Sequence, residues 1–276
     1  MNALPGNEIL TLAIALVLAG GLAGLLAGLF GVGGGAIIVP ILYQTFIVIG
    51  VPDDVRMPLT VGTSLAVIIP TAITSYLAHR KKGAVDEVAL RLWALPCVIG
   101  VVLGSAAATF APAALFKIVF AAVSAAIGVR LLVGKQETII AKDLPRPLPM
   151  RIIGFAIGIL SSLMGISGGM LTNMAMLMFG RSIHQAVATS AGLGVFISIP
   201  GAIGYALAGW PHMSELPAFS IGYVSLPGAV LLAAMGMWVA PLGARLAHAI
   251  PRRPLELAFA VYLLTMSARF VGALVW

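Results

Sequence analysis

The stretch Gly31-Val32-Gly33-Gly34-Gly35 interrupts a charge-free apolar segment that runs from Ile9 to Pro52. As a single helix, this segment would be about 66 Å long, roughly twice the thickness of a membrane's hydrocarbon core. Several glycines within five residues remove the preference for helix and permit a positive φ. The sequence therefore predicts that the chain folds back at these glycines into a hairpin over residues 9–50.

A second glycine cluster, Gly165-Ile166-Ser167-Gly168-Gly169, lies in the middle of a charge-free segment from Ile152 to Gly180. The arms on either side of it hold roughly 14 residues, or about 20 Å of helix each, which is too short to cross a membrane comfortably. We therefore expect a re-entrant hairpin over 151–180, with two fully spanning arms as the alternative.

Three ordinary apolar spans follow each hairpin. We expect them at 59–78, 92–110 and 113–133 in the first half, and at 186–208, 221–240 and 254–275 in the second. The halves also match locally, since Val61-Gly62-Thr63-Ser64 corresponds to Val187-Ala188-Thr189-Ser190. A hairpin plus three spans crosses the membrane an odd number of times, so the second half must be inverted. The predicted fold is an all-α polytopic membrane protein with two inverted repeats, 1–134 and 151–276, joined by a cytoplasmic linker at 135–150.

Composition points to a membrane location. Of the 276 residues, 61% are hydrophobic and 9% are charged, whereas soluble domains carry about 25% charged residues. The net charge of +7 is spread over short loops between apolar runs, so it indicates topology and not a nucleic-acid partner. The predicted topology puts 13 of the 16 basic residues on one side, leaving Arg56, Lys117 and Arg269 on the other. By the positive-inside rule, the basic side is cytoplasmic and both termini lie on the outer side.

The paired glycine breaks are the best candidate for a binding site. Broken helices at corresponding positions of two inverted halves free backbone N–H groups near the middle of the membrane, and the helix after each break presents its positive end there. We expect this backbone to hold a small anionic substrate. The candidate glycines are Gly33, Gly34, Gly35, Gly168 and Gly169. The alternative is that these glycines only permit tight turning and close helix packing.

Four hydroxyls and one amide are candidate side-chain ligands. The hydroxyls occur as a threonine–serine pair at the start of the helix after each hairpin: Thr63, Ser64, Thr189 and Ser190. Hydroxyls can coordinate an oxyanion, but they can equally cap a helix or bond the preceding turn. The amide of Asn173 lies four residues beyond Gly169, where a polar group is either a tie between helices or a ligand contact.

Acidic side chains are absent from the interiors of the predicted spans. A carboxylate proton relay and a cation pathway both usually require such acids, so an anion is favoured, and a coupling proton stays a hypothesis. No cofactor or metal is expected, because Cys97 is the single cysteine and no histidine cluster is present. An intramembrane enzyme is disfavoured, since no paired acids and no Ser/His/Asp set lie at membrane depth.

The motif from Gly28 to Pro40, followed by Val61-Gly62-Thr63-Ser64 and echoed at Gly165 to Gly169 and Ala188-Thr189-Ser190, resembles the sulfite exporter TauE/SafE family of bacterial and plant membrane transporters. The resemblance covers nearly the whole chain. It implies a multi-pass protein of a bacterial cell membrane that carries sulfite, sulfoacetate or another organosulfonate. It leaves the direction of transport open, because exporters and importers share these motifs.

Our interpretation of the sequence is a secondary transporter that works by alternating access, with a small sulfur-containing anion and the membrane lipid as its partners. No GxxxxGK[ST] motif occurs, so the sequence predicts no ATP-binding site that could drive transport. The alternatives are an anion channel, a carrier of an unrelated small organic acid, and a membrane subunit that needs a soluble partner. The sequence favours no particular oligomeric state.

Overall fold

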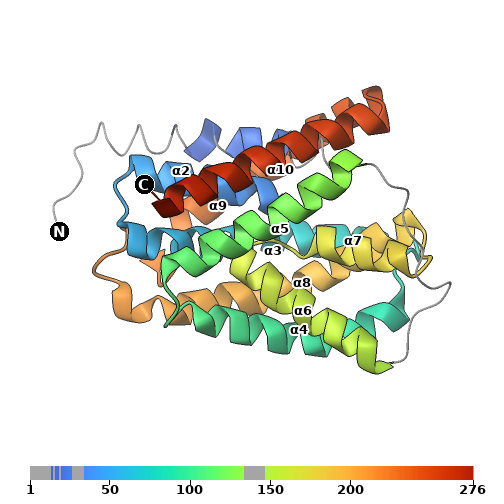
Figure 1. Ribbon diagram of the computed structural model, residues 1–276, viewed down its shortest axis with the longest axis horizontal. Helices are drawn as coiled ribbons and strands as arrows, with labels where there is room; N and C mark the ends of the chain where they lie inside the picture. Colours follow the sequence, from blue (N-terminus) through green and yellow to red (C-terminus); the bar gives the residue numbers. More distant parts are fainter. Residues whose placement is uncertain (1–13, 15, 19, 27–33, 134–146, 276) are drawn as a thin grey trace.

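The computed structural model describes residue 14 and residues 16–18, 20–26, 34–133 and 147–275. Apart from a two-stranded ribbon, its regular elements are helical, as the sequence predicts (Figure 1). The elements are α2 (Gly35–Val48), α3 (Asp53–Lys81), α4 (Glu87–Ala107), α5 (Ala113–Val133), α6 (Pro147–Met164), α7 (Gly169–Met178), α8 (Ile183–Ala208), η1 (Trp210–His212), β1 (Ser220–Ile221), β2 (Val224–Ser225), α9 (Leu226–Ala249) and α10 (Arg252–Val275).

Within this described part of the chain, 6 helices are long and apolar enough to cross a membrane. They are α3, α4, α5, α6, α8 and α10. Shorter apolar helices occur at Leu16–Leu26, in α2, in α7 and over Leu226–Val239 of α9. The prediction of an all-α polytopic membrane protein is therefore confirmed.

Several helices begin away from the predicted positions. α3 begins at Asp53 and not at residue 59, because Asp53 and Asp54 occupy its first turn, where negative charge is favourable. α9 begins at Leu226 and not at residue 221, because the preceding residues pair as the β1–β2 ribbon around Gly222, whose φ is 51°. α6 begins at Pro147, inside the predicted linker, and the linker residues before it lie outside the described ranges.

The two arms of the second hairpin are unequal, whereas the sequence predicts two similar short arms. α6 has 18 residues and α7 has 10, which correspond to about 27 Å and about 15 Å of helix. By length, α6 can cross a membrane, while α7 is a half-helix. In the first hairpin, α2 has 14 residues, and the glycines before Gly34, including Gly33, lie outside the described residues.

Helices pack mainly against helices of the other half. α4 contacts α6 and α8, α3 contacts α8, and α5 contacts α10, so these pairs run side by side in Figure 1. Small residues allow close approach: a Cβ added at Gly158 of α6 would overlap the Cys97 carbonyl of α4. The largest fully buried side chains include Trp93, Tyr205 and Phe116. Trp93 of α4 packs against Gly154 of α6, and the rings of Phe116 of α5 and Tyr205 of α8 lie 6.4 Å apart.

The helix ends fall at two opposite ends of the molecule. The end of α5 and the starts of α6 and α10 lie at the right of Figure 1, whereas α10 ends at the left. Arg130, Arg151 and Arg253 belong to the right-hand helix ends. We call this the basic end, and the opposite end contains the α2–α3 connection and the β1–β2 ribbon.

Candidate functional site

Two helices begin in the interior of the protein directly after a glycine. Gly34 precedes α2 with φ at 78°, and Gly168 precedes α7 with φ at 70°. A positive φ is strained for residues with a Cβ, so glycine suits both positions. Neither helix start donates a backbone hydrogen bond to a capping side chain. The first N–H groups of both helices, with the positive ends of their dipoles, are therefore available to a ligand.

The two glycine breaks contact each other. A Cβ added at Gly35 would lie 2.7 Å from the Ile166 Cα atom and 3.0 Å from the Gly165 carbonyl oxygen. A Cβ added at Gly165, whose φ is 70°, would lie 2.9 Å from Cγ2 of Val39. Gly35 and Gly165 are therefore required for packing, and the close approach holds the starts of α2 and α7 next to each other.

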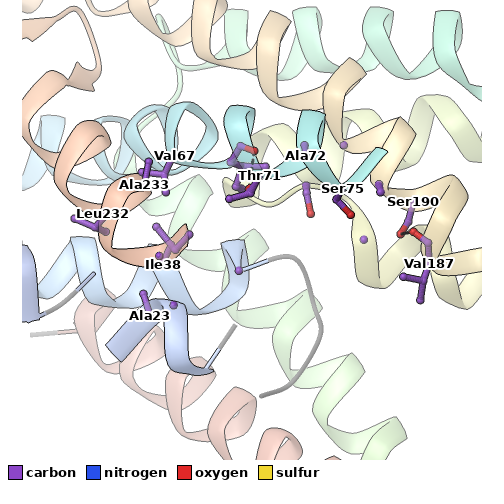
Figure 2. A pocket seen from close by; sticks show the side chains of 18 of the residues that line it. Ala23, Ile38, Val67, Thr71, Ala72, Ser75, Val187, Ser190, Leu232 and Ala233 are labelled. Carbon is purple, nitrogen blue, oxygen red and sulfur yellow. Dashed lines mark hydrogen bonds between the residues drawn. The ribbon is translucent and has the colours of Figure 1, made fainter. Parts of the chain in front are cut away.

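A cavity of about 260 Å³ lies beside these two helix starts, with Gly34 and Gly169 in its lining. Its other walls come from the segment Leu16–Leu26 and from α3, α8 and α9 (Figure 2). Ligand pockets for drug-sized molecules measure about 300–1,000 Å³, so this cavity suits a smaller solute.

Five polar side chains line the cavity: Thr71, Ser75, Ser167, Asn173 and Ser190. Ser167 is 8% exposed, and its hydroxyl has no hydrogen bond within the described part of the chain. Oδ1 of Asn173 is buried and has no partner among the residues that the structure describes. Buried polar atoms are normally hydrogen-bonded, so a ligand that carries a hydrogen-bond donor can satisfy Oδ1 of Asn173. The hydroxyl of Ser75, like that of Ser167, makes no hydrogen bond among the described residues and can donate one to a ligand. None of the lining residues carries a charge.

The threonine–serine pairs mostly bond to backbone. Oγ1 of Thr63 accepts the Ser225 N–H at 2.9 Å, and Oγ1 of Thr189 accepts the Asp86 N–H at 3.0 Å. The Ser64 hydroxyl donates to the Gly165 carbonyl at 2.7 Å. Each of these three bonds joins one half of the chain to the other.

The two threonine bonds have corresponding targets. Asp86 is the N-cap of α4, and its carboxylate accepts the Ala89 N–H at 3.0 Å. Ser225 directly precedes α9, and its hydroxyl accepts the Gly228 N–H at 3.3 Å. Each threonine therefore fixes the residue that caps a helix in the opposite half.

The cavity brings together only part of the predicted set of site residues. Gly34, Gly169, Asn173 and Ser190 line the cavity. The other described members lie beside the cavity. Two are packed closely against neighbouring parts of the chain, Gly35 and Gly168. Three make hydrogen bonds to backbone atoms, Thr63, Ser64 and Thr189. Gly33 lies outside the described residues. The sequence analysis missed Thr71, Ser75 and Ser167. Thr71 and Ser75 are single hydroxyls in an apolar helix, with nothing to mark them. Ser167 could have been chosen as a site residue, because it is a serine within a glycine cluster.

The charged clusters of the described helices do not line the cavity. Nζ of Lys117, a residue 3% exposed, lies 2.9 Å from Oδ2 of Asp53, and Arg56 bonds the same carboxylate at 3.0 Å. Asp86 pairs with Arg181 at 3.1 Å near the basic end. Among the described residues, no group of three or more His, Cys, Asp and Glu side chains could hold a metal ion.

Known proteins resemble this chain over most of its length. Residues 16–270 match the family described as sulfite exporter TauE/SafE. A probable membrane transporter protein of Haemophilus influenzae is 31% identical over 252 residues, which cover 91% of this chain and 95% of that protein. Another from Methanocaldococcus jannaschii is 30% identical over 251 residues, covering 91% and 92%. A third, from Bacillus subtilis, is 29% identical over 235 residues, covering 78% and 84%.

These names describe membrane transporters and not enzymes, and the long apolar helices agree with a multi-pass membrane protein. The glycine breaks that carried the resemblance in the sequence lie within the matched range. The chain belongs to the sulfite exporter TauE/SafE family of membrane transporters.

Proposed function

We propose that this transporter is a secondary carrier of a small anion, either sulfite or an organosulfonate, and that it works by alternating access. The observation that supports this proposal most directly is the cavity beside the uncapped starts of α2 and α7, with Gly34 and Gly169 in its lining. Two helix N-termini at one cavity make a site of positive potential, which attracts an anion.

The lining favours an anion over a cation. Helix N–H groups, hydroxyls and an amide can donate hydrogen bonds to an oxyanion without placing a fixed positive charge in the membrane. A cation would need carboxylates or a ring of carbonyl oxygens, and no lining residue is acidic. The uncharged lining also keeps the cost of an empty, desolvated site low.

The position of the cavity along α3 supports a carrier and not an open channel. The α3 residues in the lining run from Val67 to Ser75, in the half of the helix that leads to the basic end. Toward the other end of the same helix, Leu59, Val61 and Leu65 are each 0% exposed. The cavity therefore lies on the side of the basic end, with packed side chains beyond it, as expected for one state of an alternating-access cycle.

The orientation follows from the positive-inside rule. Because Arg130, Arg151 and Arg253 belong to the helix ends that we call the basic end, we assign this end to the cytoplasm. The end of α10, and with it the carboxyl terminus, then faces the outer side of a bacterial cell membrane. In this orientation, the cavity lies toward the cytoplasmic half of α3.

The experiment is flux into proteoliposomes that contain the purified chain, measured with labelled sulfite and with ethanesulfonate. We expect saturable uptake that weakens in Ser167→Ala and in Asn173→Val. The matched control is Ser124→Ala, which removes another buried hydroxyl, one that does not line the cavity. The control should keep wild-type flux.

Two outcomes would overturn the proposal. If neither anion shows saturable flux, the cargo belongs to another class. If flux rises linearly with concentration and carries current at rates above those of carriers, the protein is an anion channel. A parallel measurement with an imposed pH gradient shows whether a proton accompanies the anion.

A further inference from the structure

α4 and α6 run side by side in the same direction, and both begin at the basic end. A Cβ added at Gly154 of α6 would lie 3.0 Å from the Trp93 Cα atom of α4. Further along both helices, a Cβ added at Gly104 of α4 would overlap the Ser162 hydroxyl of α6. The contacts advance along both helices together, so the two helices are parallel. Because α6 begins at the right of Figure 1, at the basic end, α4 begins there too.

Each of these helices has an arginine as its fifth residue, Arg91 in α4 and Arg151 in α6. Both arginines therefore lie about 6 Å along the axis from the start of their helix. The contact between Trp93 and Gly154 follows both of them by less than one helical turn. Arg91 and Arg151 are therefore placed at a similar depth on two neighbouring helices.

Arg91 belongs to an exposed face of α4. Val88 comes three residues before it and Leu95 four residues after it, spacings that put the three side chains on one face. Val88 is 63% exposed, Leu95 is 69% exposed, and Arg91 is exposed as well. Ile99 and Val102 continue this exposed stripe toward the opposite end of the molecule. On a membrane-spanning helix, an exposed apolar face of this kind meets lipid.

The start of α6 has a similar surface. Leu148 and Ile152 are 68% and 59% exposed, and Arg151, which lies between them in the sequence, is exposed too. Each arginine therefore stands near the point where a lipid-facing helix surface reaches the membrane interface. An arginine side chain at this level extends its guanidinium toward the lipid headgroups and keeps its hydrocarbon part against apolar surface.

Neither arginine is neutralised within the part of the chain that the structure describes. Arg91 and Arg151 form no ion pair and no hydrogen bond with any described residue. Glu87, one helical turn before Arg91, pairs with Arg80 at 3.6 Å. The neighbouring carboxylate of Asp86 is likewise taken, because it pairs with Arg181 at 3.1 Å. Two unpaired positive charges at the edge of a lipid-facing surface attract an anionic group from the membrane.

We propose that Arg91 and Arg151 together bind the headgroup phosphate of an anionic phospholipid at the basic end of the α4–α6 pair. A guanidinium matches a phosphate in shape and can donate two parallel hydrogen bonds to it. The exposed apolar side chains of α4 and α6 then contact the acyl chains of the same lipid. Neither arginine lines the cavity, so the inference goes beyond the proposed function and does not depend on the cargo.

The test titrates the purified chain in detergent with dioleoylphosphatidylglycerol and, separately, with dioleoylphosphatidylcholine, which has the same acyl chains but no net charge. Native mass spectrometry measures the fraction of protein that carries lipid. We expect the wild type to prefer phosphatidylglycerol. Arg91→Gln and Arg151→Gln should each weaken phosphatidylglycerol binding about fivefold, and the double variant about twenty-fivefold. Binding of phosphatidylcholine should stay the same in all variants.

The matched control is Arg130→Gln, which removes the same charge at the basic end but from α5. It should bind phosphatidylglycerol as the wild type does. Because Arg91 and Arg151 are exposed, their variants should fold, and size-exclusion chromatography checks this. A second measurement is thermal unfolding: phosphatidylglycerol should raise the melting temperature of the wild type and of Arg130→Gln, but not that of the double variant.

Three results would overturn the inference. The first is equal binding of the two lipids by the wild type. The second is wild-type affinity for phosphatidylglycerol in the double variant, or an equal loss in Arg130→Gln, which would mean that only the overall charge attracts the lipid. The third is displacement of phosphatidylglycerol by inorganic phosphate, which would identify a site for a soluble anion. Failure of anion flux in proteoliposomes would overturn the proposed function and leave this lipid site unaffected.

Discussion

α2 and α7 begin in the same way: a glycine with positive φ, Gly34 or Gly168, precedes a helix start without a side-chain cap, and both starts adjoin one cavity. Their other residues differ. The second break has Ser167 and Asn173 where the first has Gly33 and Val39. Asn173 lines the cavity, whereas Val39 is 0% exposed and packs near Gly165.

The difference indicates that the two glycine breaks contribute in different ways. The start of α2 is dominated by packing, with Gly35 pressed against the Gly165–Ile166 backbone. The start of α7 carries Ser167 and Asn173, and Oδ1 of Asn173 is buried without a partner among the described residues. The two glycine breaks therefore share a helix start after a glycine with positive φ, and they differ in the side chains that they place beside the cavity.

The largest effect is expected from filling the space at the first break. Gly35→Leu places a side chain where even a Cβ would lie 2.7 Å from a backbone atom. Because backbone cannot move aside as a side chain can, we expect loss of folded, monodisperse protein in size-exclusion chromatography. Gly272→Leu is the control, since a Cβ at Gly272 meets nothing within 4 Å. Monodisperse Gly35→Leu protein with normal flux would show that the contact between the breaks is dispensable.

Exchanging one residue between the hairpins tests their different roles. Val39→Asn buries an amide in an apolar contact, so we expect the free energy of unfolding to fall by about 1–3 kcal/mol, visible as a lower melting temperature. Asn173→Val should leave the melting temperature near that of the wild type and raise KM for the anion about tenfold. Equal thermal losses in the two variants would mean that both hairpins serve packing alone.

The two threonine bonds should behave as a matched pair. Thr63→Val leaves the Ser225 N–H without an acceptor, and Thr189→Val does the same to the Asp86 N–H. Each loss should cost about 1–2 kcal/mol of stability. Thermal unfolding in detergent measures the cost, and KM should not change, because neither residue lines the cavity. A raised KM with unchanged stability would show that these hydroxyls belong to the substrate site.

The smallest effect concerns how the long helix after each hairpin begins. α8 has a capping box made by Ser182 and Gln185, whereas α3 follows Pro52 without a side-chain cap. Ser182→Ala should therefore lower stability by about 1 kcal/mol, and Pro52→Ala should lower it less. The melting temperatures of the two variants give the comparison, and a larger loss for Pro52→Ala would contradict it.

Much of the fold could be predicted because glycine clusters and charge-free lengths are local signals. The break at Gly165 to Gly169 separates α6 from α7 in the structure, and the third predicted span coincides with α5. The start of α3 could not be predicted in this way. Asp53 lies inside the helix and is neutralised by Lys117, which is 64 residues away in sequence. A prediction from charge-free lengths assigns a charged residue such as Asp53 to a loop.

The site was predicted less completely than the fold. Consecutive residues of a helix point about 100° apart, so the pair Thr189-Ser190 puts Ser190 in the cavity and Thr189 against Asp86. Sequence alone does not reveal which of two adjacent hydroxyls faces inward. No sequence motif marks Thr71 and Ser75. These residues line the cavity because the fold brings other helices opposite α3.

The pairing of helices across the halves has a consequence for biosynthesis. α3, α4 and α5 find their main partners in α8, α6 and α10, which leave the ribosome later. The hydrogen bond from the Asp86 N–H to Thr189 likewise forms only after a further 103 residues have been synthesised. The early helices must therefore wait in the bilayer, shielded by lipid or by the insertion machinery, until their partners arrive. We expect a chain that ends after the first half to lack the main packing partners of its helices.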